Sequence, residues 1–570
     1  MAEEVWMLQT KKADFKQIGA RFRIDPVTAR IIRNRGIEGE AAIDRYLNGT
    51  LDDLYDPMLL NDMERAVSIL CEAVDTGKKI RIVGDYDIDG VCSTYILLQA
   101  FERLGSDVDF EIPDRIKDGY GINESIIEQA HADGVEVILT CDNGISAFHQ
   151  VELAKKYGMM VVITDHHEVP LDGEKEKIPP ADAVIDPKQA DCPYPFPEIC
   201  GAVVAYKLVQ VLYARRGVPQ MEWLDLLEFA AIATVGDVMK LQDENRILVK
   251  YGLKKMAQTK NLGLRRLAEK NNLDLGAITA YHIGFVIGPC LNAGGRLKTA
   301  KEALALLRAQ SEEEAERLAE ELKELNDTRK DMTEQGTEAA KLQVESWYQK
   351  DKVLVVFLPE CHESLAGIIA GRLREYYQKP AIVLTRGEEA VKGSGRSIDE
   401  YHMFKKLTEV SDLLLKFGGH PLAAGLSLEE KNIDEFRRRL NENAGLTEED
   451  FKAKVWIDVP MPVGYVTERL VRELSCLEPF GQGNEKPLFA EKSLRIRASR
   501  VLGRNRNVVK MTLEETDGHA IEALYFGDGT AFEEERAGRR EIDVVYYPDI
   551  NEYNGRKTLQ AVIRRYKFRG

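Results

Sequence analysis

The sequence predicts an α/β protein of several domains, in which a long helix joins two α/β domains and a small β-barrel follows them. Between residues 79 and 186, short β-rich runs alternate with helical segments, which is typical of βαβ units around a parallel sheet. One highly charged helical segment spans about 311–348, and from 451 onward short strands are separated by turns, as in small barrels. A length of 570 residues suits about three or four domains of roughly 150 residues each.

The first α/β region follows a polar segment of about 55 residues that contains short helical pieces. The expected strands of this region are 79–85, 107–113, 135–142, 159–165 and 183–186, with helices over 91–104, 124–133 and 146–157. In parallel sheets, ligands bind at the carboxyl ends of the strands. The acidic residues of this region fall at those ends.

The second half of the chain begins with the charged helix, which at 1.5 Å per residue would reach over roughly 50 Å. We expect it to be an arm between domains; a coiled-coil dimer arm is the alternative. Gly336 is expected to kink it. Strands at 353–357 and 381–385 follow, with glycine-rich turns at 393–395 and 418–419. The expected barrel strands are 455–459, 494–501, 508–513, 521–526, 542–547 and 558–563. The expected domains are residues 1–55, 56–270, 271–350, 351–450 and 451–570.

The net charge, the apolar runs and the cysteine spacing of the chain limit the classes of protein to which it can belong. The formal net charge of −17 argues against a polyanionic partner, unless basic residues line one groove. No apolar run reaches the roughly 18 to 20 residues of a membrane span, and the acidic N-terminus does not resemble a signal peptide. The eight cysteines form no C-x-x-C pair, which excludes a common zinc pattern and fits a reducing compartment. The sequence therefore predicts a soluble, cytoplasmic protein.

The most informative string is Asp85-Tyr86-Asp87-Ile88-Asp89-Gly90, which follows the first strand. A calcium-binding EF-hand loop also begins with alternate carboxylates, but it needs a Glu at its twelfth position, and that position is Ile96 here. The remaining alternatives are a polar turn that caps the next helix and a metal site.

Further acidic residues favour the metal site. Asp142 ends a second apolar run, Asp165-His166-His167 ends a third, and Asp237 follows an apolar stretch. If the strands are parallel, these side chains meet at one edge of the sheet. Carboxylates with one or two imidazoles suit Mn²⁺ or Mg²⁺, and two such ions support hydrolysis of a phosphate ester or anhydride. A packed or exposed histidine pair is the alternative for His166 and His167.

This order of motifs, D-x-D, then Asp-Asn-Gly, Asp-His-His and a further Asp, resembles the DHH phosphoesterase family. The resemblance extends over nearly the whole chain. Residues 288–297 are similar to an interdomain motif of the family's single-strand-specific exonucleases, and residues 393–397 and 418–425 are similar to the companion DHHA1 domain. The resemblance implies a DHH domain joined by the long helix to a smaller DHHA1 domain, followed by an OB-fold barrel.

The resemblance also implies a two-ion centre with Mn²⁺ or Mg²⁺. The implied ligands are Asp89, Asp142, His166 and Asp237 for one ion, and Asp87 and Asp142 for the other, so that Asp142 bridges them. Smaller family members have a His where this chain has Val83, and Asp85 is the candidate that compensates. His167 would face the substrate phosphate as a stabiliser or proton donor.

The substrate side is expected in the second α/β domain. Gly393-Ser394-Gly395-Arg396 offers backbone amides, a hydroxyl and a guanidinium, as an anion-binding nest would; a plain turn is the alternative. The resemblance implies a pocket for a terminal 5′-phosphate. The candidate substrate-binding residues are Arg115, Asn292, Arg296, Ser394, Gly395, Arg396, Gly419 and His420.

The barrel region carries basic residues beside aromatic ones. Seven Lys and Arg stand against one Glu in 491–510, and 564–569 adds four more with Tyr566 and Phe568. This pattern favours single-strand binding through phosphate contacts and base stacking. A solvated strand face is the alternative.

The expected function is a 5′→3′ exonuclease that degrades single-stranded DNA to 5′-mononucleotides, in recombination and repair. Its polarity and its possible partners, a single-strand-binding protein and a RecQ-type helicase, come from the resemblance. The chain has no P-loop motif, and we expect a monomer. The alternatives are a hydrolase of nanoRNA, cyclic dinucleotides or pyrophosphate, and a catalytically inactive DNA-binding relative.

Overall fold

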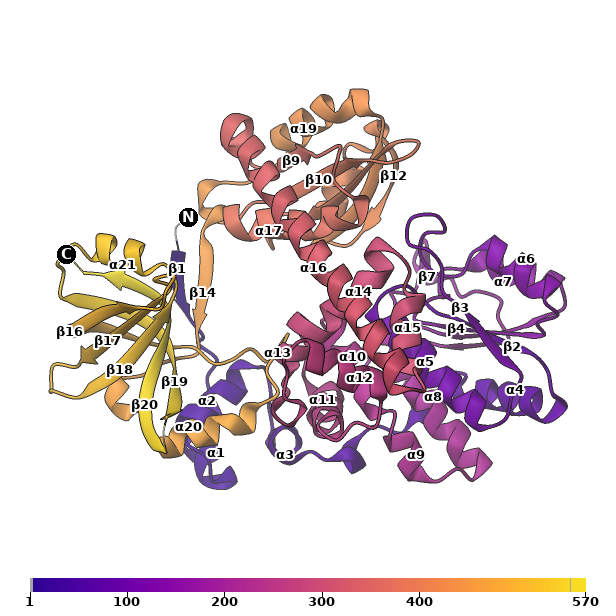
Figure 1. Cartoon of the computed structure of the whole chain (residues 1–570), viewed down its shortest axis with the longest axis horizontal. Helices are drawn as coiled ribbons and strands as arrows, with labels where there is room; N and C mark the ends of the chain where they lie inside the picture. The colour runs from indigo at the N-terminus through magenta and orange to yellow at the C-terminus, as the bar shows by residue number, and fades with distance from the viewer. Residues whose placement is uncertain (1–3, 554, 570) are drawn as a thin grey trace. The chain divides into compact units, whose positions relative to one another are not determined.

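The computed structural model describes residues 4–553 and 555–569 (Figure 1). These residues form two compact units. The first contains residues 55–239 and 251–453, and the second contains residues 5–54, 240–250 and 454–570. In the described part of the chain, no helix is both long and apolar enough to cross a membrane.

The first unit begins with a parallel sheet of five strands in the order β3-β2-β4-β5-β8. The strands are β2 (Ile80–Val83), β3 (Val108–Glu111), β4 (Val137–Cys141), β5 (Met160–Thr164) and β8 (Ala183–Ile185). All neighbouring pairs are parallel, as the sequence predicts. Their nearly continuous apolar runs are typical of strands that are covered on both faces.

Helices cover both faces of this sheet (Figure 1). On one side lie α6 (Glu124–Ala132) and α7 (Phe148–Lys156), and on the other lie α4 (Met63–Thr76), α5 (Ile88–Arg103) and α8 (Gly201–Arg216). The short strands β6 (Leu171–Asp172) and β7 (Lys175–Glu176) form a hairpin. The helices that follow are α9 (Gln220–Leu224), α10 (Leu227–Gly236), α11 (Asp243–Met256), α12 (Leu262–Lys270), α13 (Ala280–His282), a π-helical turn (Ile283–Ile287), α14 (Gly288–Leu297) and α15 (Lys301–Arg308).

The long connecting helix is α16 (Glu312–Gln343), about 48 Å long at 1.5 Å per residue. Its N-cap Ser311 accepts a hydrogen bond from the Glu314 amide, and three Glu residues in the first turn complement the helix dipole. The helix α16 continues through Gly336 without interruption, and the kink expected there stays a prediction. A Cβ at Gly336 would lie 2.6 Å from Ile369 Cδ1, so this glycine allows close packing of the next helix.

A mixed five-stranded sheet completes the first unit, in the order β12-β13-β11-β10-β9. Its elements are β9 (Leu354–Phe357), α17 (Ala366–Tyr377), β10 (Ala381–Arg386), β11 (Val391–Arg396), α18 (Met403–Thr408), β12 (Leu414–Gly419), β13 (Ala423–Leu428) and α19 (Ile433–Glu442). The expected turns at 393–395 and 418–419 are wrong, because both stretches are strand residues paired with β13.

The second unit contains a closed β-barrel. Its ring consists of β16 (Phe489–Leu502), β17 (Val508–Glu514), β18 (Ala520–Phe526), β20 (Arg556–Phe568) and β19 (Glu541–Tyr553), and β19 pairs back onto β16. The remaining elements are β15 (Val459–Pro460), α20 (Glu468–Leu474), α21 (Gly529–Arg536) and the pair β1 (Glu4–Leu8) with β14 (Ala453–Ile457). The predicted barrel is therefore confirmed.

The N-terminal segment packs into the core of this barrel unit. It forms α1 (Phe15–Phe22), α2 (Pro26–Asn34) and α3 (Glu40–Asn48). Ile32 of α2 and Tyr46 of α3 belong to the same buried cluster as Leu477 and Phe489 of the barrel region. Residues far apart in the sequence thus share one apolar core.

Candidate metal centre and phosphate pocket

The first carboxylates of the site lie in the turn between β2 and α5. Asp87 is the N-cap of α5, and its Oδ1 accepts hydrogen bonds from the amides of Asp89 and Gly90 at 2.9 and 3.2 Å. Asp89 follows in the first helical turn, where a negative charge is favourable. Capping thus fixes the Asp87 carboxylate at the carboxyl end of β2.

Asp142 lies at the end of β4 with a positive φ of 61°. Its carbonyl oxygen accepts a hydrogen bond of 2.7 Å from the Tyr120 hydroxyl. The first residue of α8, Gly201, packs against it: a Cβ at Gly201 would lie 2.7 Å from Asp142 Cβ. The glycine therefore allows the amino end of α8 to approach the centre of the site.

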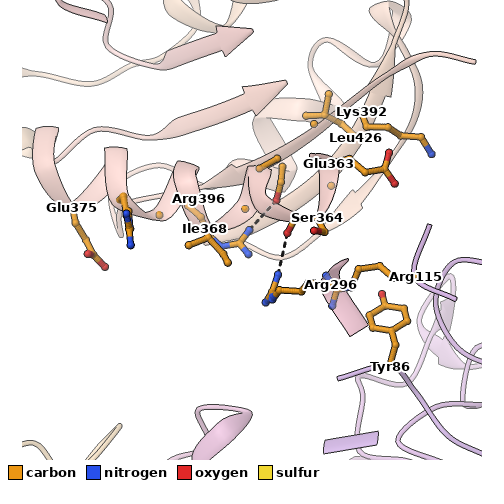
Figure 2. A pocket seen from close by; sticks show the side chains of 17 residues that line it. Tyr86, Arg115, Arg296, Glu363, Ser364, Ile368, Glu375, Lys392, Arg396 and Leu426 are labelled. Atoms are coloured by element: carbon orange, nitrogen blue, oxygen red, sulfur yellow. Dashed lines mark hydrogen bonds between the residues drawn. The ribbon is translucent and has the colours of Figure 1, made fainter. Parts of the chain in front are cut away.

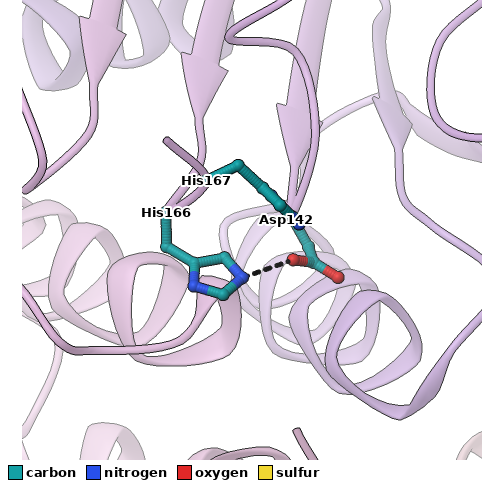
Figure 3. Close-up of side chains that lie close together, drawn as sticks. All are labelled: Asp142, His166 and His167. Atoms are coloured by element: carbon teal, nitrogen blue, oxygen red, sulfur yellow. Dashed lines mark ion pairs between the residues drawn. The ribbon is translucent and has the colours of Figure 1, made fainter. Parts of the chain in front are cut away.

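His166 connects carboxylates from three different elements. Its Nε2 lies 3.1 Å from Asp142 Oδ1 (Figure 3). The same nitrogen lies 3.5 Å from Asp89 Oδ2 and 3.9 Å from Asp237 Oδ2. Asp237 is the C-cap of α10. The amides of Gly201 and Ala202 each donate a 2.7 Å hydrogen bond to Asp89, so a helix amino terminus orients this carboxylate.

The predicted ligand residues fall into overlapping groups that could hold metal ions. Within each group the candidate ligand atoms lie within 4.8 Å of one another. The groups are Asp89, His166 and Asp237; Asp85, Asp87 and Asp142; and Asp142, His166 and His167. Asp142 thus shares one group with Asp85 and Asp87 and another with His166, as a bridging carboxylate would.

The chemistry of this cluster fits divalent cations. Asp85 Oδ2 is buried without a hydrogen-bond partner among the described residues, and Asp142 Oδ1 is buried with only the His166 ring nitrogen near it, at 3.1 Å. Burial, and then the charge of Asp87, raises the pKa of Asp85 to about 8. Burial and neighbouring carboxylates also raise the pKa values of Asp89, Asp142 and Asp237. Cations that neutralise the carboxylates would remove this unfavourable charge, and oxygen ligands with one imidazole suit Mn²⁺ or Mg²⁺.

Asp165 orients the second histidine instead of joining the cluster. Its Oδ1 lies 2.7 Å from His167 Nδ1, and Oδ2 accepts a hydrogen bond from the Ile145 amide. Burial lowers the pKa of His167, but the hydrogen bond and charge of Asp165 outweigh burial and raise it to about 9. The His167 side chain is 41% exposed, so a proton-bearing imidazole faces the open side of the site.

Tyr120 belongs to this site although no sequence motif marks it. Its hydroxyl lies within 3.2 Å of the His167 ring nitrogens, in addition to its bond to the Asp142 carbonyl. Tyr120 is part of an irregular loop before α6, so neither strand nor helix periodicity marks it. Its distance from Asp142 in the sequence hides a contact that the sheet creates.

A polar pocket of about 810 Å³ lies in the same unit (Figure 2). Four predicted substrate-binding residues line it, namely Arg115, Arg296, Ser394 and Arg396. Arg296 donates a 3.0 Å hydrogen bond to the Ser364 carbonyl just before α17, and its pKa is lowered to about 10 by burial and by nearby Arg115. Guanidinium groups gathered in this way suit a phosphate.

The amino end of a helix contributes backbone to this pocket. The predicted nest at 393–396 is wrong, because these residues pair with β10 on one side and β13 on the other. The amino end of α17 lines the pocket instead, with Ala366, Gly367 and Ile368. A Cβ at Gly367 would lie 2.9 Å from both Ser394 Oγ and an Arg396 nitrogen, so this glycine leaves room for both.

The other predicted substrate-binding residues do not line this pocket. Gly395 is buried under it, next to Met403. Asn292 is half-buried on α14, four residues before Arg296. Gly419 ends β12, and His420 follows it with an exposed side chain. Their roles stay predictions.

The basic residues of the barrel are partly neutralised. Lys492, Arg495, Arg497 and Arg500 of β16 are exposed, and alternate with buried residues in the middle of the strand. Arg497 pairs with Glu514, and Lys510 of β17 pairs with Glu522 at 2.8 Å. The net positive charge of this face is therefore smaller than the sequence count suggests.

Comparisons with known proteins agree with this architecture. Family models match residues 79–234 (DHH family, N-terminal domain), 350–445 (DHHA1 domain) and 457–565 (RecJ OB domain). Single-stranded-DNA-specific exonuclease RecJ of Bacillus subtilis is 36% identical over 98% of this chain and 70% of its own length. RecJ of Escherichia coli is 34% identical over 95% of both chains. The chain belongs to the RecJ family.

Solved RecJ structures resemble this one and contain metal ions. The crystal structure of Thermus thermophilus RecJ in complex with Mn²⁺ has a TM-score of 0.84, with 28% identity over 99% of this chain and 80% of the other. The same protein in complex with Mg²⁺ has a TM-score of 0.78, with 27% identity over 99% and 78% of the two chains. Together with the acidic cluster, these relatives support Mn²⁺ or Mg²⁺ as the cofactor of this chain.

Proposed function

We propose that this chain is a 5′→3′ exonuclease that hydrolyses single-stranded DNA to 5′-mononucleotides in recombination and repair. The observation that carries this proposal is a cationic phosphate pocket in the same compact unit as a cluster of metal-ligating carboxylates. The names of the RecJ relatives support the substrate and the activity. A hydrolase of small phosphates is less well supported, because the RecJ OB domain would have no task in it.

Two ions would be held by residues from four elements. We assign Asp89, Asp142, His166 and Asp237 to one ion, and Asp85, Asp87 and Asp142 to the other. Bound Mn²⁺ or Mg²⁺ would lower the pKa of water and neutralise charge at the scissile phosphate. The hydrogen bonds from α8 to Asp89 and from α5 to Asp87 fix these ligands before substrate arrives.

The remaining residues bind and orient the strand. The terminal 5′-phosphate would be held by Arg115, Arg296, Ser394 and Arg396. The next phosphodiester is one nucleotide away and would then lie at the carboxylates of the metal centre. Hydrolysis there breaks the bond from phosphorus to the 3′-oxygen of the terminal nucleotide. The raised pKa of His167 favours a proton on this ring at neutral pH, and His167 would donate it to that leaving oxygen, while Asp165 keeps the ring in place.

The domains have separate tasks in this proposal. Residues 56–270 form the DHH domain, 271–350 the interdomain motif and helix, 351–450 the DHHA1 domain and 451–570 the OB-fold that retains the strand, after an extension of residues 1–55. Gly419 and His420 would contact the nucleotide next to the scissile bond. Asn292 and Gly395 stay candidate substrate-binding residues without an assigned contact. We further propose a cytoplasmic monomer that acts with a single-strand-binding protein and a RecQ-type helicase.

The test uses 5′-labelled single-stranded and duplex DNA with Mn²⁺ or Mg²⁺, and measures product size. Labelled mononucleotides from the single strand alone are the expected result. His166→Ala should remove hydrolysis while binding of DNA in EDTA persists. Labelled fragments of many lengths would contradict the proposal, because an endonuclease or a 3′→5′ exonuclease leaves the 5′ label on such fragments. Turnover of the variant at the wild-type rate would contradict the metal assignment.

A further inference from the structure

A stripe of accessible side chains runs along the helical segment from α13 to α14. Most of the other residues from 281 to 296 are buried. Tyr281 and Phe285 are exposed. Pro289, Asn292 and Arg296 follow at intervals of three or four residues and are half-buried, as expected on one face of a helix; His282, Gly284 and Val286 beside the rings are also half-buried.

The stripe begins with two exposed aromatic rings. Tyr281 is 63% exposed and Phe285 is 67% exposed. Their rings stack with centroids 4.7 Å apart and planes inclined by 25°. Phe285 lies in the π-helical turn Ile283–Ile287, a local form that is frequent at functional sites. Adjacent exposed large aromatic side chains mark surfaces that contact a ligand or partner.

The same segment packs along the metal centre. A Cβ at Gly288 would lie 3.3 Å from Ile88 Cδ1, and Ile88 stands between Asp87 and Asp89. A Cβ at Gly284 would lie 3.6 Å from Val235 Cγ1, two residues before the Asp237 carboxylate. The aromatic rings are therefore one turn away from elements that carry the proposed metal ligands.

The other end of the stripe reaches the phosphate pocket. Arg296 lines that pocket and lies eleven positions after Phe285, about 17 Å along the helix at 1.5 Å per residue. Asn292 lies between them on the same face. A strand with its 5′-phosphate at Arg296 would thus have its following nucleotides on the side of Asn292 and the two rings.

We propose that Tyr281 and Phe285 form a stacking platform for unpaired bases on the 3′ side of the scissile bond. This inference rests on the proposed function and names a base-binding site within it. Every nucleobase offers a flat face to an aromatic ring, so the platform accepts any sequence. Bases within a duplex are already stacked on each other, so the platform favours single strands over duplexes.

The first test compares a 5′-phosphorylated 12-nucleotide single strand with a 5′-phosphorylated dinucleotide, which is too short to reach the rings. Tyr281→Ala combined with Phe285→Ala should raise KM for the 12-mer at least about tenfold, because base stacking on both rings is lost. The same variant should hydrolyse the dinucleotide at nearly the wild-type rate. Tyr281→Phe combined with Phe285→Tyr keeps both rings and should behave as wild type. Trp347→Ala removes a 71% exposed ring elsewhere and should also leave KM unchanged.

Abasic strands provide a readout that a merely structural role would not change. Removing the bases at positions 3 to 5 from the 5′ end should weaken binding by the wild type but not further weaken binding by the double alanine variant. The proposal is wrong if the abasic positions and the two alanine substitutions weaken binding additively. It is also wrong if the double alanine variant has an unchanged KM for the 12-mer. If the wild type hydrolyses neither the 12-mer nor the dinucleotide, the proposed function itself fails.

Discussion

Asp142 shows how much negative charge the chain concentrates at its metal centre. The residue is buried, and its pKa is raised first by burial and then by Asp89 and Asp87. Its backbone adopts a left-handed conformation, which Asp and Asn tolerate better than most residues do. Without cations, this carboxylate opposes folding; with them, it can bridge two ions.

Asp142→Asn should separate these two effects. The amide keeps the size and the backbone preference of Asp142 but removes its charge. We expect turnover to fall by more than about 100-fold, since loss of outer-shell partners alone costs 10- to 100-fold. We also expect the variant to unfold at a higher temperature than the wild type in EDTA, because carboxylate repulsion is relieved. Thermal unfolding with and without Mn²⁺ measures the second effect, and wild-type turnover would contradict the bridging role.

A second buried carboxylate, Glu228, lies at the opposite end of α10 from the proposed metal ligand Asp237. It is 3% exposed at the start of α10, and Thr259 Oγ1 donates a 2.7 Å hydrogen bond to it. Burial raises its pKa from 4.5 to about 7. The folded state therefore holds a proton that the unfolded chain releases between these two pH values.

This proton gives a pH dependence with a definite sign. Since the folded state binds more protons at this site, the contribution of Glu228 to the free energy of unfolding should fall by about 3 kcal/mol as pH rises from about 4.5 to 7. Glu228→Gln should remove this contribution, so urea denaturation at pH 5 and pH 7.5 should differ less in the variant. If the stability difference between pH 5 and pH 7.5 is the same in Glu228→Gln and in the wild type, Glu228 is ionised at both pH values. The exposed Glu324→Gln is the matched control.

At the scale of elements, helix ends assemble both sites. The amino end of α8 orients Asp89, the amino end of α5 is capped by Asp87, and the amino end of α17 lines the phosphate pocket. Two of these ends require glycine, Gly201 and Gly367, because a side chain there would occupy the space of a functional residue. Unbonded amides and the helix dipole favour negative groups at such positions.

Gly201→Ala tests the contact between α8 and the metal centre. The new Cβ would meet Asp142 Cβ at 2.7 Å and displace either the carboxylate or the helix. Overpacking of this kind costs about 1–3 kcal/mol of stability. We expect kcat to fall more than tenfold with weaker Mn²⁺ binding by calorimetry. Gly276→Ala, at an exposed position, should change neither quantity, and normal Mn²⁺ affinity in Gly201→Ala would rule out this role for the glycine.

At the scale of the whole molecule, the barrel unit is built from three stretches of the chain. Residues 5–54 and 240–250 join residues 454–570 in it. Arg246 is buried there and donates hydrogen bonds to the carbonyls of Tyr46, Cys476 and Leu477 at 2.7–3.1 Å. Its guanidinium also lies 4.1 Å from the centroid of the Tyr46 ring. A truncation at residue 451 would therefore remove the partners of the N-terminal helices, in addition to the barrel.

Arg246→Ala should destabilise this unit by about 3 kcal/mol or more, because buried carbonyl groups lose their donors. Hydrogen exchange measured by mass spectrometry should show faster exchange in residues 5–54 and 454–570. Arg246→Lys retains the charge with fewer donors in a different geometry and should give an intermediate effect. If both variants exchange at the same rate as the wild type, residues 5–54, 240–250 and 454–570 are held together without Arg246.

The fold class could be predicted from the sequence, and so could the residues proposed for most of the candidate site. Strand and helix periodicities are local, so the parallel sheet, the long helix and the barrel could be predicted from neighbouring residues. The motif order was equally informative, because Asp87, Asp142 and His166 each end or follow an apolar run at the same edge of the sheet.

Tertiary structure decided what depends on distant contacts. Glycine-rich stretches in β11 and β12 suggested turns, but pairing with neighbouring strands overrode that local preference. Three features join residues that no local sequence pattern connects. They are the helix end at Gly367 in the phosphate pocket, the contact of Tyr120 with His167, and the core shared by Ile32 and Phe489. Packing brings these groups together through the chain's three-dimensional path, which sequence spacing does not record.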